Sequence, residues 1–250
     1  MSRTLPSPQA SDVRGVHGRR PYELWLPPGD GPFPAMVVLH GAGSRKENQS
    51  DFGRVCRDAG WAAVTFDQRG HGESRDAMTP AALGDVEAMA ELLMWTEGID
   101  AGRICVRGSS MGGFMAIHAA ASIEEIAGVI AICPAGEEGL RRELKAGTLD
   151  MRADVEAMDE WFAESDLRES VEAMGRKPLM LIHAKGDEQI PYTWSEELAS
   201  HAEDPFKLIL LPGGHHRSAQ HDLELQGIAL RWLEQALDKV QPPPGTIPIE

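Results

Sequence analysis

The stretch RICVRGSSMGG, residues 103–113, places a serine between a predicted strand and a predicted helix. Its first five residues carry Ile, Cys and Val and indicate a buried strand. Residues 111–121 are rich in alanine and other helix formers. The spacing Gly108-x-Ser110-x-Gly112 between a strand and a helix is typical of a nucleophile elbow. A turn this sharp crowds the backbone, and glycines relieve that crowding.

The position of Ser110 suits nucleophilic chemistry. A serine at the tip of the turn is exposed above the sheet, and the N–H of Met111 opens the following helix. That N–H points towards whatever the serine attacks, which favours a developing oxyanion. The pentapeptide also occurs in ordinary Gly/Ser-rich loops, and Ser109 is the neighbouring alternative, so the rest of the chain must decide.

Length and composition predict one α/β domain spanning residues 1–250. The chain has 250 residues, of which 42% are hydrophobic, enough for one sizeable core. A net charge of -15 disfavours nucleic acid and anionic membrane surfaces as partners. The three cysteines have no C-x-x-C spacing, which favours buried free thiols in a reducing cytosol (Cys56, Cys105 and Cys133).

The sequence favours a cytoplasmic protein. Residues 1–18 are polar and contain no apolar core of a secretory signal. No apolar run approaches the roughly 20 residues that cross a bilayer, so we expect no integral membrane contact. The oligomeric state stays open, and a homodimer is one of the states that the sequence allows.

Strand-like and helical segments alternate along the chain, which favours a mostly parallel central sheet with helices on both faces. We expect the first strand to run antiparallel, because a short Pro/Gly turn joins it to the second. Residues 1–20 and 241–250 read as loose ends. The expected strands are 23–26, 35–39, 62–66, 104–107, 128–132, 179–183 and 207–211, and the expected helices are 51–59, 81–97, 111–121, 194–201 and 223–237.

Residues of about 135–177 interrupt this alternation. Apolar side chains recur there at roughly helical spacing among many acids, which predicts two or three short amphipathic helices. We expect them to form a small helical cap above Ser110; a plain crossover elaboration is the alternative. The apolar positions are Leu140, Leu144, Val155, Met158, Trp161, Phe162, Leu167, Val171 and Met174.

Three other loops follow predicted strands and carry candidate groups. HGAG, residues 40–43, presents backbone amides, and Ala42 is the best candidate for a second oxyanion donor. Asp187 follows the strand 179–183, where open α/β sheets keep functional groups. Its carboxylate would orient a histidine, with Glu188 as the nearest competitor.

A pair of histidines follows the last predicted strand, in LPGGHH at residues 211–216. Either His215 or His216 could reach the serine. The order along the chain is then Ser, Asp, His, which is the order of one class of hydrolase.

These motifs together resemble the α/β-hydrolase superfamily, and most closely its serine esterase and monoacylglycerol-lipase-like members. The resemblance spans Tyr22 to Leu237. Five motifs carry it in family-like order: HGAG at 40–43, FDQRGHGES at 66–74, GSSMG at 108–112, GDEQIP at 186–191 and LPGGHH at 211–216.

The resemblance implies the α/β-hydrolase fold and a Ser110–His216–Asp187 triad. The family usually ends this motif as Pro-Gly-x-x-His, which favours His216 over His215. It also assigns the second oxyanion amide to Ala42 beside that of Met111. His71 lies on a loop that the family keeps for structure. No metal or organic cofactor is expected.

The implied activity is hydrolysis of a small-molecule carboxylic ester of short to medium acyl chain, through an acyl-enzyme. Two alternatives stay open. One is an amide or peptide hydrolase, or an acyltransferase, on the same triad; Glu137 and Glu138 could then bind the free amine of a peptide. The other is a non-catalytic binding protein with the same fold.

Overall fold

The computed structural model describes residues 11–240, and its centre is a sheet in the order β1-β2-β4-β3-β5-β6-β7-β8. Neighbours from β4 to β8 pair parallel, whereas β1 and β2 pair antiparallel, as does β2 with β4. The strands are β1 (Val13–His17), β2 (Arg20–Trp25), β3 (Phe33–Leu39), β4 (Ala62–Phe66), β5 (Ile99–Ser109), β6 (Ile126–Ile132), β7 (Leu179–Ala184) and β8 (Phe206–Leu211).

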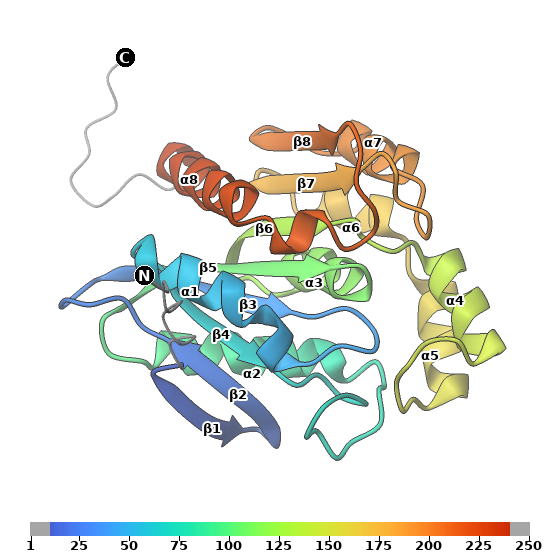
Figure 1. The fold of residues 1–250 in the computed structure, drawn as a ribbon, viewed down its shortest axis with the longest axis horizontal. Helices are drawn as coiled ribbons and strands as arrows, with labels where there is room; N and C mark the ends of the chain where they lie inside the picture. Colours follow the sequence, from blue (N-terminus) through green and yellow to red (C-terminus); the bar gives the residue numbers. More distant parts are fainter. Residues whose placement is uncertain (1–10, 241–250) are drawn as a thin grey trace, which may run out of the picture.

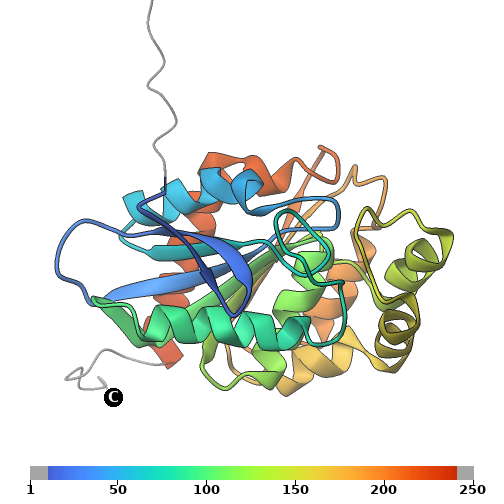
Figure 2. The same ribbon diagram turned by 90° about the horizontal axis from the view of Figure 1, so that it is seen from below.

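Helices cover both faces of the sheet (Figure 2). Helices α1 and α8 pack on one face, and α2, α3, α6 and α7 form the layer on the other. The α-helices are α1 (Ser50–Asp58), α2 (Ala82–Met94), α3 (Met111–Ser122), α4 (Glu137–Ala146), α5 (Val155–Glu164), α6 (Leu167–Ala173), α7 (Thr193–Ser200) and α8 (Leu223–Val240). The short 3₁₀ helices are η1 (Lys46–Gln49) and η2 (Ala219–His221).

The central strands are buried on both faces, which explains their continuous apolar sequences. Every residue of β4, β6 and β7 is buried. Two apolar clusters result, one on each face of the sheet. The predicted α/β architecture with a mostly parallel sheet and helices on both faces is confirmed, including the antiparallel first predicted strand, which is β2.

The N-terminal part of the chain differs from the prediction. Residues 13–17 form the edge strand β1 instead of a loose end. Its sequence VRGVH leaves Val13 and Val16 exposed, so the apolar signal of a buried strand is missing. Backbone pairing with β2 holds the strand in place. The other expected loose end, 241–250, lies outside the described residues.

The segment between β6 and β7 contains three helices, as expected, but they divide into two groups. Helices α4 and α5 pack on each other and lie beyond the carboxyl ends of the strands (Figure 1). Helix α6 instead packs against α3, within the helical layer. The part that overhangs the sheet is therefore α4, α5 and their connecting loop.

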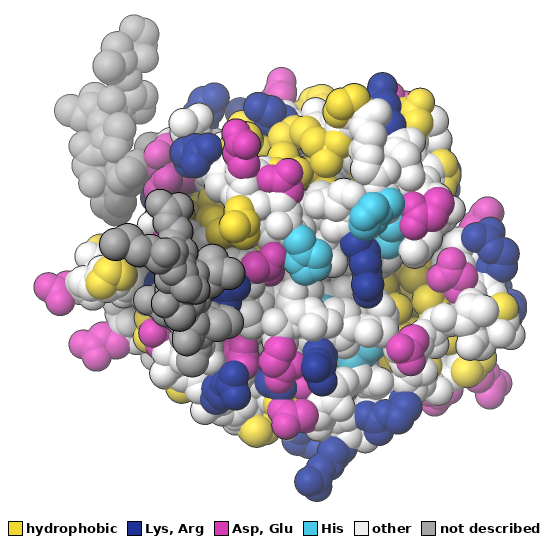
Figure 3. Space-filling view, viewed as in Figure 1, with side chains coloured by type: hydrophobic (Ala, Val, Ile, Leu, Met, Phe, Trp, Pro, Cys, Tyr) yellow, Lys and Arg dark blue, Asp and Glu magenta, His cyan; other side chains and the backbone are white. Residues whose placement is uncertain are grey.

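No helix within residues 11–240 is long and apolar enough to cross a membrane. Acidic and basic side chains are interspersed on the face seen in Figure 3.

Candidate active site

The candidate residues come together at the carboxyl edge of the sheet, where open α/β folds place ligands. Ser110 follows β5, and Ala42 lies in the loop after β3. Asp187 and His216 follow the neighbouring strands β7 and β8. Segments more than a hundred residues apart in sequence thus meet in one place.

Ser110 occupies a strained turn. Its backbone has φ 55° and ψ -122°, a conformation rare for a residue with a side chain. The Ser110 N–H donates to the Ile132 carbonyl at 3.0 Å, and the Ser110 carbonyl accepts from Gly113 N–H at 2.9 Å. A Cβ on Gly108 would lie 1.9 Å from the Gly112 carbonyl oxygen, so glycine is obligatory there.

Ser109, the neighbouring alternative, is engaged elsewhere. Its side chain is 4% exposed and its hydroxyl donates to Oε1 of Gln220 at 2.6 Å. The geometry therefore leaves Ser110 as the free hydroxyl of the pair.

His216 and Asp187 form a close pair. Nδ1 of His216 lies 2.7 Å from Oδ2 of Asp187, whose side chain is completely buried. A carboxylate accepts, so Nδ1 carries the proton and Nε2 of a neutral ring is free to take one. His215 is exposed and its Nδ1 accepts from Arg217 N–H at 3.3 Å. Of the two candidate bases, only His216 is paired with the acid.

Asp187 is stabilised as a carboxylate. Burial by itself would raise its pKa, but hydrogen bonds from His183 and His216 and from two backbone amides hold the pKa well below its usual range. Those amides belong to Gln189 and Ile190 and donate to Oδ1 at 2.8 and 2.9 Å. The competitor Glu188 only accepts from the His216 backbone N–H, at 3.4 Å.

Two backbone amides remain available beside Ser110. Among the described residues, neither the Ala42 nor the Met111 N–H donates to a protein acceptor. The Gly41 carbonyl accepts from Nδ1 of His40 at 2.9 Å. Because C=O and N–H point in opposite directions across a trans peptide, this bond turns the Ala42 N–H away from His40. A Cβ on Gly41 would lie 3.3 Å from the Ser110 Cβ, so the two loops touch.

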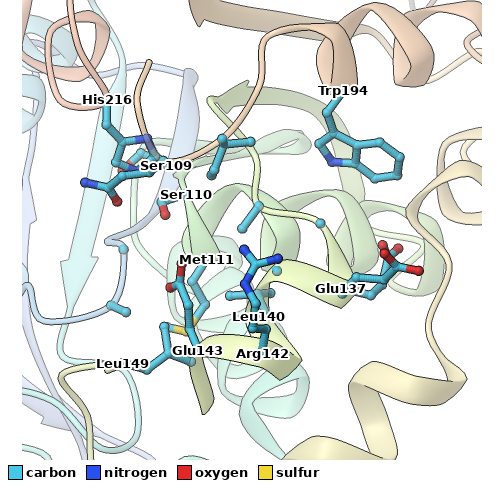
Figure 4. Close-up of a pocket in the computed structure, with 18 of the residues that line it drawn as sticks. Ser109, Ser110, Met111, Glu137, Leu140, Arg142, Glu143, Leu149, Trp194 and His216 are labelled. Atoms are coloured by element: carbon cyan, nitrogen blue, oxygen red, sulfur yellow. The ribbon is translucent and has the colours of Figure 1, made fainter. Parts of the chain in front are cut away.

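A cavity of about 700 Å³ opens over these groups. Ser110 and His216 lie at one end, and Trp194 and Glu137 lie at the other (Figure 4). Helix α4 forms one wall and the β7–α7 loop another. The site is thus a partly open pocket beneath α4, rather than a flat surface.

Charged side chains line much of this pocket. Of the nine predicted apolar positions of the cap, only Leu140 lines the pocket, and most of the others pack in the core. The charged lining consists of Glu137, Glu138, Arg142, Glu143, Asp150, Arg168, Glu197 and Arg217. In Figure 4 the labelled Arg142 and Glu143 both project into the pocket from α4.

Comparison with known families decides the membership of the chain. The serine aminopeptidase S33 family matches residues 31–164, more than half of the chain. The chain belongs to this family of α/β hydrolases. The matched residues include Ala42, Ser110 and Met111, but end before Asp187 and His216.

This α/β hydrolase has relatives of partly known activity. It is 25% identical over 230 residues to the uncharacterized protein YfhR of Escherichia coli K12, covering 86% of this chain and 76% of that protein. It is 36% identical over 114 residues to 2,6-dihydropseudooxynicotine hydrolase of Paenarthrobacter nicotinovorans, covering 44% of this chain and 30% of that enzyme.

Solved structures share the fold of this α/β hydrolase. Est1E of Butyrivibrio proteoclasticus, solved with ferulic acid, superposes with a TM-score of 0.71 at 20% identity, covering 91% of this chain and 99% of Est1E. A monoacylglycerol lipase of Paleococcus ferrophilus gives 0.66 at 17% identity, covering 86% and 98%.

One cluster in this α/β hydrolase has the side chains of a metal site, although the sequence predicted none. Ligand atoms of Cys133, Asp187 and His216 all lie within 4.8 Å of one another. Burial raises the pKa of the Cys133 thiol to about 12, so the thiolate ligand is scarce. Nδ1 of His216 is also committed to Asp187. The cluster therefore suits a hydrogen-bonded pair better than a metal ion.

Sequence reasoning missed two buried groups that hold this site. His183 on β7 lies 3.3 Å from Asp187 through its Nε2 atom. Arg107 on β5 is completely buried and donates to the Gln220 carbonyl. The signal for both was a polar residue inside an otherwise apolar strand.

Proposed function

We propose that this α/β hydrolase cleaves small-molecule carboxylic esters of short to medium acyl chain through Ser110, His216 and Asp187. The observation that carries the proposal is that His216, joined to the buried Asp187 at 2.7 Å, lines the same pocket as the strained Ser110. A serine hydrolase needs this combination of nucleophile, base and orienting acid.

In the proposed mechanism, Nε2 of His216 takes the Ser110 proton as Oγ attacks the ester carbonyl carbon. The Ala42 and Met111 N–H groups bind the oxyanion; one such donor contributes about 3–4 kcal/mol to transition-state stabilisation. The intermediate collapses by breaking the C–O bond, and His216 protonates the leaving alcohol. The same base then activates water, which releases the acid from Ser110.

The pocket sets the range of substrates that we propose. Its volume of about 700 Å³ holds a short or medium chain. Apolar contact is limited to a few side chains such as Leu140, Leu149 and Ile190, while charged groups line much of the remaining wall. We therefore expect activity to fall for long acyl chains.

Aminopeptidase activity is the second candidate, favoured by the description of the family and by the acids of the pocket. Glu137 is 9% exposed, and burial raises the pKa of its carboxyl. Its Oε1 already accepts from the Leu167 N–H. A glutamate that already accepts a backbone hydrogen bond is a weaker ligand for a substrate ammonium. We therefore propose esterase activity ahead of aminopeptidase activity.

The test is hydrolysis of p-nitrophenyl esters from acetate to palmitate, beside aminoacyl-p-nitroanilides. We expect ester turnover with an optimum at short to medium chains, abolished in Ser110→Ala and retained in Ser109→Ala. Anilide turnover without ester turnover would replace the proposal with the aminopeptidase. No serine-dependent turnover of either substrate class would contradict both.

We also propose a cytoplasmic location. All three cysteines are buried free thiols, as expected in a reducing compartment. Fractionation of the source cells with an antibody against the chain tests this location. The homodimer stays a prediction, which light scattering of the purified protein tests.

A further inference from the structure

A second imidazole contacts the acid of the proposed triad. The side chain of His183 is completely buried, and its Nε2 lies 3.3 Å from Oδ2 of Asp187. This is the same oxygen that lies 2.7 Å from Nδ1 of His216. The two histidines therefore share one carboxylate oxygen.

Hydrogen bonds fix the tautomer of His183. Its Nε2 lies 3.0 Å from the Ile190 carbonyl oxygen, which can only accept, so Nε2 carries a proton. Its Nδ1 lies 2.7 Å from Oγ of Ser195, another completely buried side chain. In the neutral ring Nδ1 accepts the hydroxyl proton of Ser195. The Nε2–H then reaches both Ile190 and Asp187.

We propose that His183, held by Ser195, is a positioning residue that fixes the Asp187 carboxylate and limits how strongly it attracts the proton of His216. The inference rests on the proposed roles of Asp187 and His216 as acid and base. A second imidazole on Oδ2 divides the negative charge of that oxygen between the two histidines. His216 then stays less basic than it would be opposite an unshared carboxylate.

Two further titratable groups, Cys133 and Glu188, lie near this pair. Cys133 from the end of β6 lies in the same cluster, and its buried thiol stays protonated at neutral pH. Glu188 accepts from the backbone of His216 at 3.4 Å. Neither of these groups donates a nitrogen-bound proton to Oδ2, so His183 is the natural position to alter.

The experiment compares His183→Leu, which removes the donor, with His183→Gln, which can keep one. Ser195→Ala removes the hydrogen bond that holds Nδ1 of His183, with little change in volume. Ser200→Ala, on the exposed part of the same helix, is its matched control. For each folded variant we would record the pH profile of kcat/KM. The NMR resonance of the His216 Nδ1–H is measured in the resting protein and assigned by its loss in His216→Asn.

We expect the acid limb of kcat/KM to move up by about half to one pH unit in His183→Leu, because His216 becomes more basic. The Nδ1–H resonance should move downfield. Ser195→Ala should show a smaller shift of the same sign, and His183→Gln and Ser200→Ala should match the wild type. If His183→Leu does not fold, Ser195→Ala decides.

A folded His183→Leu or Ser195→Ala with an unmoved limb and an unmoved resonance would overturn the proposal, as would a shift towards lower pH. Reduced thermal stability alone would indicate a structural role. The resonance needs no substrate, so the NMR arm tests His183 even if Ser110-dependent turnover is absent. Absent turnover would instead count against the proposed function.

Discussion

Nη2 of Arg107 donates to the backbone carbonyl of Gln220 at 2.8 Å, which joins the strand before Ser110 to the loop after His216. The same guanidinium donates from Nη1 to Oε1 of Gln49 at 2.7 Å and lies 4.3 Å from the ring centroid of Phe52. Burial lowers the pKa of Arg107 to about 10, which still leaves it charged at neutral pH.

Arg107→Met should therefore destabilise the protein and make the segment that carries His216 more mobile. The buried Oε1 of Gln49 loses its donor, and the Gln220 carbonyl keeps only the one from Gln226. Each lost hydrogen-bond partner costs about 1–3 kcal/mol. We expect the free energy of unfolding in urea to fall by about 2–4 kcal/mol, and kcat to fall more than KM rises. Arg107→Lys, which keeps one donor, should lose less. A loss under about 0.5 kcal/mol would show that this link contributes little.

His216→Ala should reduce kcat by about four orders of magnitude or more, because triad members act as a unit. His215→Ala is the matched control, since His215 is exposed and does not contact Asp187. It should cost less than about tenfold. Ester turnover by the two purified variants measures both effects, and the reverse order would assign the base to His215.

Gly108→Ala should prevent stable folding, because the new Cβ would lie 1.9 Å from a backbone oxygen of Gly112. Gly84→Ala is the matched control in the helix α2, where an added Cβ meets nothing within 4 Å. That control should gain about 0.5–1 kcal/mol. Thermal unfolding of the soluble fractions distinguishes the two, and a Gly108→Ala protein as stable as the wild type would refute the tight packing of the elbow.

As the pH falls, the free energy of unfolding should decrease because buried histidines are neutral in the folded protein. This decrease should begin before the carboxylates are protonated. Burial lowers the pKa of His118 to about 4, below its ordinary value of 6.5. The unfolded chain then binds a proton that the folded chain does not, so this stability is present above pH 6.5 and is lost as pH falls towards 4.

His118→Asn tests this dependence. Between pH 6 and 4 the variant should reduce the slope of unfolding free energy against pH by about 1.4 kcal/mol per unit. Urea unfolding at several pH values measures the slope. His17→Asn, the same substitution at a half-buried position of the edge strand β1, is the control. Equal slopes in His118→Asn and wild type would show that His118 is protonated in the folded protein.

The sequence alone predicted that the candidate residues would lie at one edge of the sheet, because strand ends carry strong signals. The flanking glycines indicated Ser110 as a candidate. Asp187 and His216 were indicated by their positions directly after apolar strands. Parallel strands bring their carboxyl ends to one edge, so an alternating pattern was enough to predict that these loops meet. The family resemblance favoured His216 over His215, and in the structure only His216 of the two is paired with Asp187.

Other features left little or no sequence signal. The edge strand β1 is held by backbone pairing, which apolar patterning does not report. His183 ends an apolar run, and nothing in the run indicates a partner four residues away. Helical periodicity identified the cap helices, but could not tell whether their apolar faces pack on the core or line a pocket. Phe162 and Met158 pack in the core, while Arg142 reaches the pocket.

Covalent labelling of the resting protein with a fluorophosphonate tests the central claim most directly. Tandem mass spectrometry of the wild type, Ser110→Ala and Ser109→Ala would locate the adduct. We predict one adduct at Ser110 that is lost in Ser110→Ala, persists in Ser109→Ala and forms far more slowly in His216→Ala. An adduct on Ser109, or none on any serine of the folded wild type, would contradict the assignment of Ser110 as the nucleophile.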